Sequence, residues 1–483
     1  MNALHKLDDW FVGRVSFPAT NYLLNRSGVL ASYRELLKSE YYPQEQLEEM
    51  QLRRFRAVLR HAYQLCPYYT KKLKQLGVAP DEIRSLEDVR RIPALSKREV
   101  VEHGEEMIDM RYRRSLQAGQ GSPRVPGQPG QPIPLGRFRR RKLIRNVSSG
   151  STGAPVAFYD DGSISAASWA FELRLRRWYG IEAGAREARM ARVSADYMPN
   201  DRQIWARKRL WHQLMLPGSN LTDKEYALCL RKLREFKPRV LWGYTAALAG
   251  LAEYAQRSGE DVSSFSPELA IGWAGPVYEH EEKIIKDVFG CAVSNIYSSR
   301  EVGHIAAWCP NHTWHVSQEH VLVESNADPA QGELGEIIVT PLSLSPMPFI
   351  RYRLGDIGQL ASSKCACGRT LQVMQDFLGR TGEIFVTKDG RMITAVFWNR
   401  IFMVGGQSQF VERFQIVYRR PDQIAIRIVK RNGFAESIEE DIRQILRKNF
   451  SPDIHFQFEY VPRIDPQASG KYQVVVNEVG RRH

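Results

Sequence analysis

Short apolar runs alternate with helical stretches from about Arg239 onward, and this alternation restricts the fold more than any other feature of the sequence. Strands that alternate with helices predict a parallel α/β sheet. Ligands of such sheets bind beyond the carboxyl ends of the strands, so we expect a binding site at the loops "GYT", "AGP" and "YSSRE". In chain order the alternating segments are "RVLWGY", "TAALAGLAEYAQRSG", "ELAIGWAG", "PVYEHEEKIIKDVFG" and "AVSNIYSS".

The flanking segments predict other elements. Residues 31–115 carry apolar residues at three- and four-residue spacing, which predicts helices, and Gly119–Gly136 is rich in Pro and Gly, which predicts an exposed connector. The stretch "SISAASWAFELRLRRWYG" predicts an amphipathic helix. Further along, "HVLVE" and "GELGEIIVTPL" predict antiparallel strands.

A domain boundary is expected near Gly379. Beyond it, "EIFVTKDGRMI" predicts a hairpin with Asp389 and Gly390 at its turn, "QIAIRIVK" a strand and "SIEEDIRQILRKNF" a helix. A chain of 483 residues is too long for one ordinary core. We therefore expect an α/β protein with two domains. Residues 1–378 would form a large N-terminal domain of several subdomains with parallel sheets and helices, and residues 379–483 a small α+β domain.

The composition is that of a globular protein with an anionic partner. Hydrophobic residues make up 43% of the chain and charged residues 25%, and the net charge is +14. The run Arg137–Arg145 is mostly basic. A nucleotide or coenzyme with several phosphates would match this charge, and solvated surface is the alternative. No zinc-finger spacing, helix-turn-helix or RNA-binding signature predicts nucleic acid as the partner.

The sequence predicts a cytoplasmic protein. No apolar run is long enough to span a bilayer, since the nearest, Leu241–Ala255, contains Glu253. Asp8 and Asp9 stand where a signal peptide needs its apolar core. Six cysteines in so long a chain do not form a disulfide scaffold.

A loop rich in Ser, Thr and Gly occupies Ser148–Gly153, followed by Pro155. Gly permits positive φ, and Ser and Thr hydroxyls bond to nearby backbone groups, so this composition favours a tight loop. Such loops present several N–H and O–H donors to one anion, as phosphate-binding loops do. A linker is the alternative on composition alone.

Five stretches in one order carry a family resemblance: "SSGSTGAP", "YSSRE", "FIRYRLGDIG", "LGRTGEIF" and "SGKYQVVV". Over nearly the whole chain they resemble the acyl-adenylate-forming superfamily, in its branch of phenylacetate–coenzyme A ligases and CapK-type capsule-biosynthesis proteins. The resemblance implies an AMP-forming ligase that activates a carboxylic acid with MgATP and transfers the acyl group to a nucleophile, by default coenzyme A. It also implies that the small C-terminal domain is a mobile lid.

The resemblance assigns roles to individual residues. Glu301 matches the Mg²⁺-binding acid, Asp356 the acid that accepts the ribose hydroxyls, and Lys471 the lysine of the first half-reaction, so Lys471 and Glu301 are the expected catalytic residues. Arg380 matches the arginine after the hinge. The expected nucleotide-binding residues are Ser148, Ser149, Gly150, Ser151, Thr152, Gly153, Gly275, Pro276, Tyr297, Ser298, Asp356 and Arg380.

Three positions depart from the family pattern. Ala154 replaces a common Lys, Ser298 replaces Gly beside the adenine, and Glu383 replaces Asp at the hinge. The strand ends that form the family's acyl pocket are expected to place there Trp242, Tyr244, Trp273 and Ala274. Aromatic walls suit an aryl or flat acid, and they equally suit ordinary core packing.

Soft ligands cluster in two stretches, "WCPNHTWH" and "SSKCACGRT". Three sulfurs and one imidazole would complete a closed tetrahedral zinc site, and CapK-like proteins carry a similar arrangement. We expect His315 rather than His312 to be the fourth ligand, because it lies farther from Cys309 and enters a strand. The expected structural zinc ligands are Cys309, His315, Cys365 and Cys367, with free thiols as the alternative.

Two other functions stay open. CapK-type proteins suggest amide or ester transfer to an amino acid or sugar in place of coenzyme A. A non-catalytic nucleotide-binding relative is the third reading, favoured by Ala154 and Glu383 and opposed by the presence of Lys471 and Glu301. The sequence also leaves open a homodimer.

Overall fold

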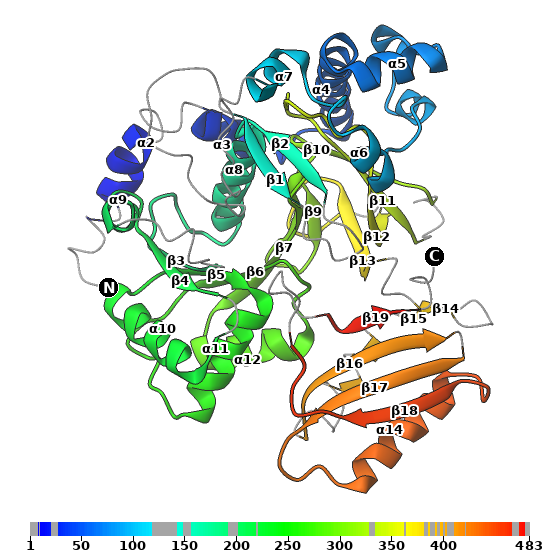
Figure 1. Ribbon diagram of the computed structural model, residues 1–483. Helices are drawn as coiled ribbons and strands as arrows, with labels where there is room; N and C mark the ends of the chain where they lie inside the picture. Colours follow the sequence, from blue (N-terminus) through cyan, green and yellow to red (C-terminus); the bar gives the residue numbers. More distant parts are fainter. Residues whose placement is uncertain are drawn as a thin grey trace.

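A computed structural model shows a main body built on one wide sheet and a smaller C-terminal part with its own sheet (Figure 1). It describes residues 8, 10–20, 28–117, 143–147, 156–191, 201–218, 221–327, 334–361, 364–380, 385–386, 392–393, 397–398, 401–402, 410–420, 422–465 and 473–478. No helix within these residues is long and apolar enough to cross a bilayer. The expected α/β class, with a large N-terminal part and a separate smaller sheet, is confirmed.

The main sheet has eleven strands, and one half of it is parallel. Its neighbouring strands β7, β6, β5, β3 and β4 all run in one direction. The central strands β5 and β6 are near-continuous apolar runs, as a sheet buried on both faces requires, whereas β3 carries the buried charges Glu187 and Arg189. The strands are β3 (Glu187–Ala191), β4 (Gln213–Pro217), β5 (Val240–Tyr244), β6 (Leu269–Trp273) and β7 (Ala292–Ser299).

Helices cover both faces of this parallel half, as the sequence predicts. One face packs against α10 (Asp223–Phe236), α11 (Thr245–Arg257) and α12 (Glu279–Phe289). The other face packs against α8 (Ser163–Trp178), through Phe171, Leu175 and Trp178. The short helix α9 (Asp201–Leu210) leads directly into β4.

The other half of the sheet is antiparallel, in the order β10-β11-β12-β13-β9-β8. The predicted pairing of β10 with β11 is confirmed, with Val321 opposite Pro341. These strands are β8 (Gly303–Trp308), β9 (Trp314–Val316), β10 (Val321–Ser325), β11 (Gly335–Pro341), β12 (Tyr352–Ala361) and β13 (Val373–Arg380).

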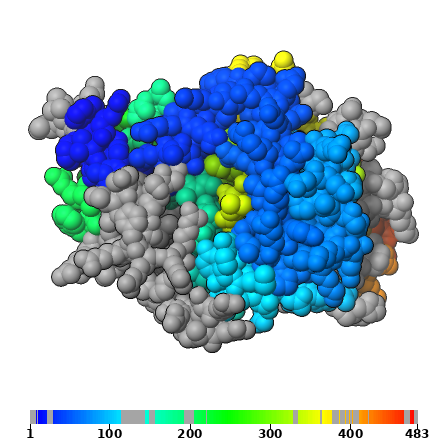
Figure 2. Space-filling view, turned by 90° about the horizontal axis from the view of Figure 1, so that it is seen from above, coloured from blue at the N-terminus to red at the C-terminus, as the bar shows by residue number. Residues whose placement is uncertain are grey.

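The N-terminal third forms a helical layer over the molecule, seen as blue in Figure 2. Its longest helix, α4, carries an apolar stripe that packs onto the antiparallel strands, as the predicted spacing requires. Its elements are η1 (Val12–Ser16), α2 (Phe17–Thr20), α3 (Gly28–Ser39), α4 (Gln44–Leu65), α5 (Pro67–Leu76), η3 (Pro80–Glu82), η4 (Asp88–Arg91), α6 (Lys97–His103) and α7 (Met110–Gln117). A hairpin follows, formed by β1 (Ile144–Val147) and β2 (Ala157–Asp160). The predicted connector Gly119–Gly136 lies outside the described residues.

The C-terminal part is a four-stranded mixed sheet in the order β18-β17-β16-β19, and the helix Glu436–Asn449 packs against it. The predicted hairpin is confirmed by the pairing of β14 with β15, although its turn at Asp389 and Gly390 lies outside the described residues. The predicted strand and helix correspond to β17 and α14. The elements are β14 (Phe385–Val386), β15 (Met392–Ile393), β16 (Val411–Arg420), β17 (Gln423–Lys430), α14 (Glu436–Asn449), β18 (His455–Tyr460) and β19 (Val475–Asn477).

The helix α8 differs from its prediction, because most of its charged residues do not face solvent. Glu172, Arg174 and Arg176 are buried, and Arg177 is exposed. Arg174 pairs with Glu319 at 2.7 Å, and both side chains are 0% exposed. Burying a charge is costly unless it is paired and hydrogen-bonded, and these side chains meet that condition through partners on β3 and on the segment between β9 and β10.

Candidate nucleotide and acyl site

The carboxyl ends of β5 and β6 lie side by side, with Tyr244 opposite Trp273 in the ladder. Their rings stack at 5.2 Å between centroids, so the two strand ends share one aromatic wall. The indole N–H of Trp273 is buried and has no hydrogen-bond partner among the residues that the structure describes. Ala274, directly after the strand, has a φ of +65°, a conformation that costs energy for a residue other than Gly and that turns the chain sharply.

Trp242 lies elsewhere. It is 3% exposed and packs within the core on the α8 side of the sheet, with the guanidinium groups of Arg189 and Arg176 over its ring at 4.7 and 5.8 Å. Of the four residues expected at the acyl pocket, the structure thus brings three together at the strand ends, and it places Trp242 in the middle of β5.

The loop after β6 is held in place by two side chains. The carbonyl of Gly275, which precedes Pro276, accepts hydrogen bonds of 3.3 Å from the hydroxyl of Thr245 and from the side-chain amide of Asn295. Asn295 is 1% exposed, and its own Oδ1 has no partner in the described part of the chain. Sequence reasoning missed this residue. The sequence feature that could have identified Asn295 is its single amide side chain within the predicted buried strand "AVSNIYSS".

Tyr297 of β7 contacts Asp356 of β12, although the two strands are not neighbours in the sheet. The Tyr297 hydroxyl lies 2.7 Å from Oδ2 of Asp356 and donates a hydrogen bond to it, and both residues are 8% exposed. The Tyr297 ring also contacts Phe377, with 4.4 Å between centroids. Asp356 lies opposite Arg380 in the β12–β13 ladder. Only the backbone of Arg380 is described, and through it the structure gathers three of the expected nucleotide-binding residues.

The turn between β7 and β8 carries Glu301, which is 8% exposed. No donor among the described residues bonds to its carboxylate. The preceding Arg300 donates a 2.7 Å hydrogen bond to the carbonyl of Val147, the last residue of β1. Ser298 lies opposite His304 at the start of this turn. The turn therefore lies against the strand that leads into the Ser148–Gly153 loop.

Several expected residues lie outside the described part of the chain. These are Ser148, Ser149, Gly150, Ser151, Thr152, Gly153 and Lys471, together with the divergent positions Ala154 and Glu383. The loop's two flanking strands are described, with Val147 opposite Ala157.

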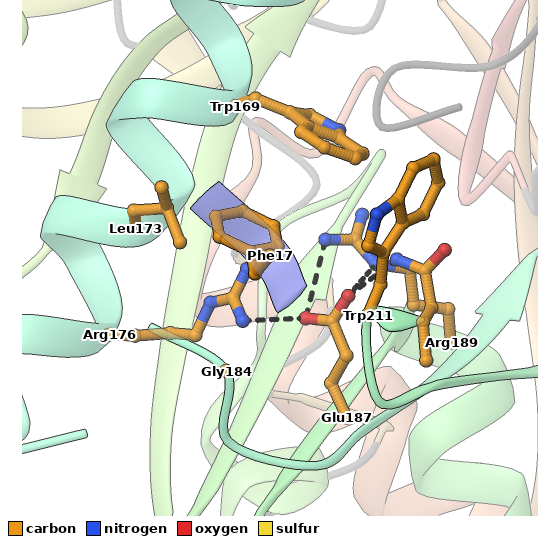
Figure 3. A pocket seen from close by; sticks show the side chains of 9 residues that line it. Phe17, Trp169, Leu173, Arg176, Gly184, Glu187, Arg189 and Trp211 are labelled. Carbon is orange, nitrogen blue, oxygen red and sulfur yellow. Dashed lines mark hydrogen bonds and ion pairs between the residues drawn. The ribbon is translucent and has the colours of Figure 1, made fainter. Parts of the chain in front are cut away.

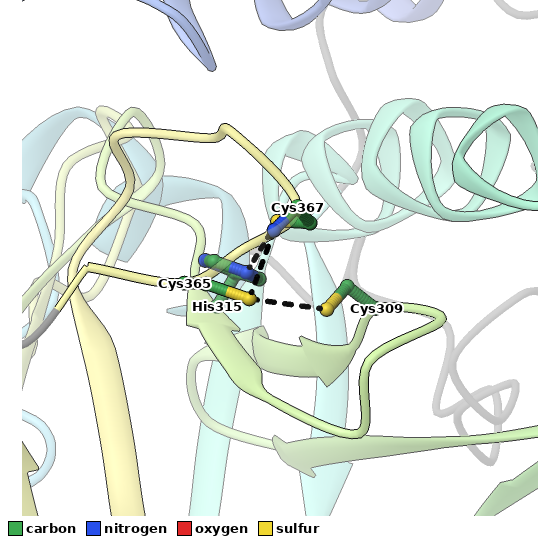
Figure 4. A group of neighbouring side chains, drawn as sticks. All are labelled: Cys309, His315, Cys365 and Cys367. Carbon is green, nitrogen blue, oxygen red and sulfur yellow. Dashed lines mark hydrogen bonds between the residues drawn. The ribbon is translucent and has the colours of Figure 1, made fainter.

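Four soft ligands converge at a second place: Cys309 directly after β8, His315 in β9, and Cys365 and Cys367 in the segment before β13 (Figure 4). Their ligating atoms all lie within 4.8 Å of one another. The sulfurs of Cys309 and Cys365 are 3.8 Å apart, and the sulfur of Cys367 is 3.2 Å from Nε2 of His315. His312 instead lies 3.5 Å from Glu282.

The donor set fits a tetrahedral zinc ion. With bonds of about 2.3 Å to sulfur and 2.0 Å to nitrogen, neighbouring ligand atoms would be about 3.5–3.8 Å apart, close to the observed spacings. Burial lowers the pKa of His315 to about 4, so the ring is neutral at neutral pH. Its Nδ1 faces the carbonyl of Leu371 at 3.4 Å, which leaves Nε2 as the nitrogen directed at the sulfurs.

Known proteins similar to this chain match most of its length. Residues 385–478 match the CapK C-terminal domain. The phenylacetate–coenzyme A ligase of Thermus thermophilus is 24% identical over 423 residues, which cover 83% of this chain and 86% of that protein. The chain is also 22% identical to the CapK protein of Staphylococcus aureus over 344 residues, or 71% of this chain and 76% of that protein. It is thus distantly similar to phenylacetate–coenzyme A ligases and CapK proteins over most of its length.

A solved structure has the same fold. The 2-hydroxyisobutyryl-CoA ligase in its postadenylation state, in complex with R3-HIB-AMP, matches this chain with a TM-score of 0.67 at 19% identity over 91% of both chains. The chain thus shares the fold of that ligase.

Proposed function

We propose that the protein activates a carboxylic acid with MgATP, forming an acyl-adenylate and pyrophosphate, and then transfers the acyl group to the thiol of coenzyme A. The observation that carries this proposal is the Tyr297–Asp356 pair, in which Tyr297 lies two residues along β7 from Asn295, whose amide bonds to the Gly275 carbonyl. A carboxylate has two acceptor oxygens, so Asp356 can hold both ribose hydroxyls while Tyr297 fixes its orientation.

The neighbouring groups suit an adenine. The unpartnered Oδ1 of Asn295 is an acceptor for the exocyclic amine, and the Tyr297 ring offers a flat apolar surface. Gly275 and Pro276 would line the same pocket, with Ser298 next to Tyr297. These positions lie at the edge of the parallel strands where ligands of such sheets bind.

The phosphates would be held by residues Ser148–Gly153, beside the turn that carries Glu301. The Glu301 carboxylate is a suitable ligand for Mg²⁺, which when bound neutralises charge on the phosphates. Lys471 would stabilise the charge that develops as the carboxylate oxygen attacks the α-phosphorus, and Arg380 would contact the ribose or phosphate. We place the boundary between the N-terminal domain and the C-terminal lid at Gly379.

The acid would lie against Tyr244, Trp273 and Ala274. The stacked rings form a flat apolar wall, and the unpartnered indole N–H of Trp273 offers one donor to a polar group of the acid. We therefore infer an aryl or arylacetic acid. The Cys/His cluster would hold a structural zinc ion, because all four ligand positions are filled by protein atoms and none is left for water.

A second function has one observation in its favour. Residues 385–478 match the CapK C-terminal domain, and the family resemblance implies that this domain faces the acceptor in the second step. Transfer to an amine or hydroxyl acceptor instead of coenzyme A is therefore the alternative.

Pyrophosphate release with a panel of aryl and aliphatic acids tests the proposal. We expect release that depends on the acid and on Mg²⁺, with coenzyme A required for turnover beyond one acyl-adenylate per enzyme. The absence of acid-dependent release from any acid would refute ligase activity. Turnover with an amine or sugar in place of coenzyme A would select the alternative acceptor. Lys471→Ala is the matched inactive control.

A further inference from the structure

The first helix of the chain, through η1 and α2, has an apolar outer face. Trp10 is 59% exposed, Phe11 52% and Val15 43%, although large apolar side chains are normally buried. Trp10 and the exposed Arg14 are four residues apart, as are Phe11 and Val15, so the four side chains lie on one side of the helix. A helix that is apolar on its outer side as well as its inner side is typical of a helix with a second contact partner.

The inner face of the same helix is firmly docked. Val12 is 1% exposed and Phe17 7%, and the Phe17 ring contacts Trp169 at 6.3 Å in the pocket of Figure 3. A Cβ at Gly13 would lie only 2.3 Å from the carbonyl oxygen of Ala183, so the backbones pack closely. The helix is therefore part of the folded body, and among the described residues its outer face points away from the core.

A second exposed aromatic residue lies on the neighbouring helix α9. Trp205 is 63% exposed, and Arg209 lies one helical turn further on. The two helices are in contact, because the Ser16 hydroxyl donates a 3.0 Å hydrogen bond to the carbonyl of Leu210. Figures 1 and 2 both show α9 beside the N-terminal helix. We call Trp10, Phe11, Val15 and Trp205 the aromatic patch.

The charges around the aromatic patch are basic. Arg14, Lys208 and Arg209 are exposed on the two helices. Asp8 lies 3.0 Å from Arg186, 3.1 Å from His212 and 3.9 Å from Arg209, so this one carboxylate is shared among three basic side chains. The partner of the patch should therefore be apolar at its centre and anionic around it.

We propose that the aromatic patch docks onto an anionic lipid bilayer at the level of the headgroups. Tryptophan and phenylalanine beside arginine and lysine are the composition of interfacial helices, and the cations add attraction to acidic lipids. A second copy of the chain suits the patch less well, since a twofold contact would bring the same cations of both copies together.

Docking in this orientation leaves the candidate nucleotide site accessible. Asp8 contacts Arg186 and His212, which directly precede β3 and β4, so the helix lies near the amino ends of the parallel strands. Tyr244 and Trp273 lie at the opposite, carboxyl ends. The membrane would hold the protein without covering the ends of the strands where the acid binds.

Vesicle co-sedimentation of the full chain tests the proposal, with phosphatidylcholine vesicles that contain or lack phosphatidylglycerol. We expect binding to the anionic vesicles that weakens with added salt and is much weaker on the neutral ones. The variant Trp10→Ser/Phe11→Ser/Trp205→Ser should bind at least about tenfold more weakly. The matched control, Tyr41→Ser/Val101→Ser/Leu344→Ser, changes residues that are 54%, 57% and 51% exposed elsewhere, and it should bind like the wild type.

A second measurement does not depend on how well these variants fold. Brominated lipids should quench part of the wild-type tryptophan fluorescence, and the conservative variant Trp10→Phe/Trp205→Phe should lose that quenched part. Equal binding to neutral and anionic vesicles, unchanged binding of the patch variant, or quenching that survives Trp10→Phe/Trp205→Phe would overturn the proposal. So would a wild-type dimer in light scattering that the patch variant converts to monomer, because a second copy would then be the occupant.

Discussion

Replacing Glu319 with Gln tests how the buried helix α8 is held. The substitution keeps the shape of the side chain and removes the negative charge opposite Arg174, whose guanidinium lies 2.7 Å away. Arg174 cannot lose its own charge, and its remaining contacts are Ser317 Oγ at 3.2 Å and the rings of Phe171 and Trp178. The variant therefore leaves a buried cation without its anionic partner.

The expected cost follows from this geometry. Breaking a fully buried ion pair destabilises a protein by about 3–5 kcal/mol. An unfolding entropy of about 2.1 cal/mol/K per residue, over roughly 370 residues of the main body, amounts to about 0.8 kcal/mol per degree. Glu319→Gln should therefore lower the Tm of the main body by about 4–6 °C.

Scanning calorimetry measures this shift, and Glu102→Gln is its matched control. Glu102 pairs with Arg98 on the surface, with side chains 45% and 85% exposed, so its loss should change Tm by about 1 °C or less. The double variant Arg174→Met/Glu319→Leu should recover most of the loss, because no unpaired charge remains. A Tm of Glu319→Gln equal to that of Glu102→Gln would refute the reasoning.

The same pair has a pH dependence. Burial acts to raise the pKa of Glu319, but Arg174 and the Ser39 hydroxyl outweigh it and hold that pKa below its usual value. The folded-state pKa is thus below the unfolded one, so the stabilisation is complete above the unfolded pKa and is lost as pH falls through the folded pKa. The Tm difference between wild type and Glu319→Gln should be constant at neutral pH and shrink in acid.

Three further predictions concern the candidate sites. Lys471→Ala should slow acyl-adenylate formation by about a hundredfold or more and leave the Kd for ATP nearly unchanged, because the lysine would act in the transition state. Pre-steady-state pyrophosphate release measures the rate and ATP titration measures the Kd, and equal losses in both would contradict the role. Asp356→Ala should raise the KM for ATP by about tenfold or more, and Tyr297→Phe by less, because the ribose contact exists in the ground state; an unchanged KM in Asp356→Ala would remove the residue from the site. Purified protein should contain about one zinc per chain, and Cys367→Ser should lower metal content and Tm together. Any loss of activity in this variant should follow the unfolded fraction. Wild-type stability in metal-free protein would show that the cluster needs no ion.

The parallel half of the sheet was predictable because each strand is followed closely by the helix that packs on it. The continuous eleven-stranded sheet was not, because the antiparallel half closes through the pairing of Val373 with His315, which are far apart in the sequence. The register between distant strands depends on tertiary packing, and local sequence periodicity does not predict that packing.

Some residues of the candidate sites could likewise be predicted from the sequence, and others could not. The four soft ligands could be named from residue type and spacing, and so could Tyr297 and Asp356 from their motifs. The pairing of Glu172 with Arg189 and of Arg174 with Glu319 could not, because a helical pattern of charges looks the same whether its partners are waters or buried side chains. Trp242 was wrongly expected at the acyl pocket, because an aromatic residue near a strand end is equally compatible with a pocket and with a core.

The strand β13 links places that are remote from one another in the sequence. Near its start Val373 pairs with His315 of the Cys/His cluster, and at its end Arg380 pairs with Asp356. The chain leaves the main sheet directly after this strand and continues to the C-terminal part. Contacts that hold the Cys/His cluster together therefore also fix the position of β13. The point from which the chain continues to the C-terminal part is thereby anchored to the main sheet.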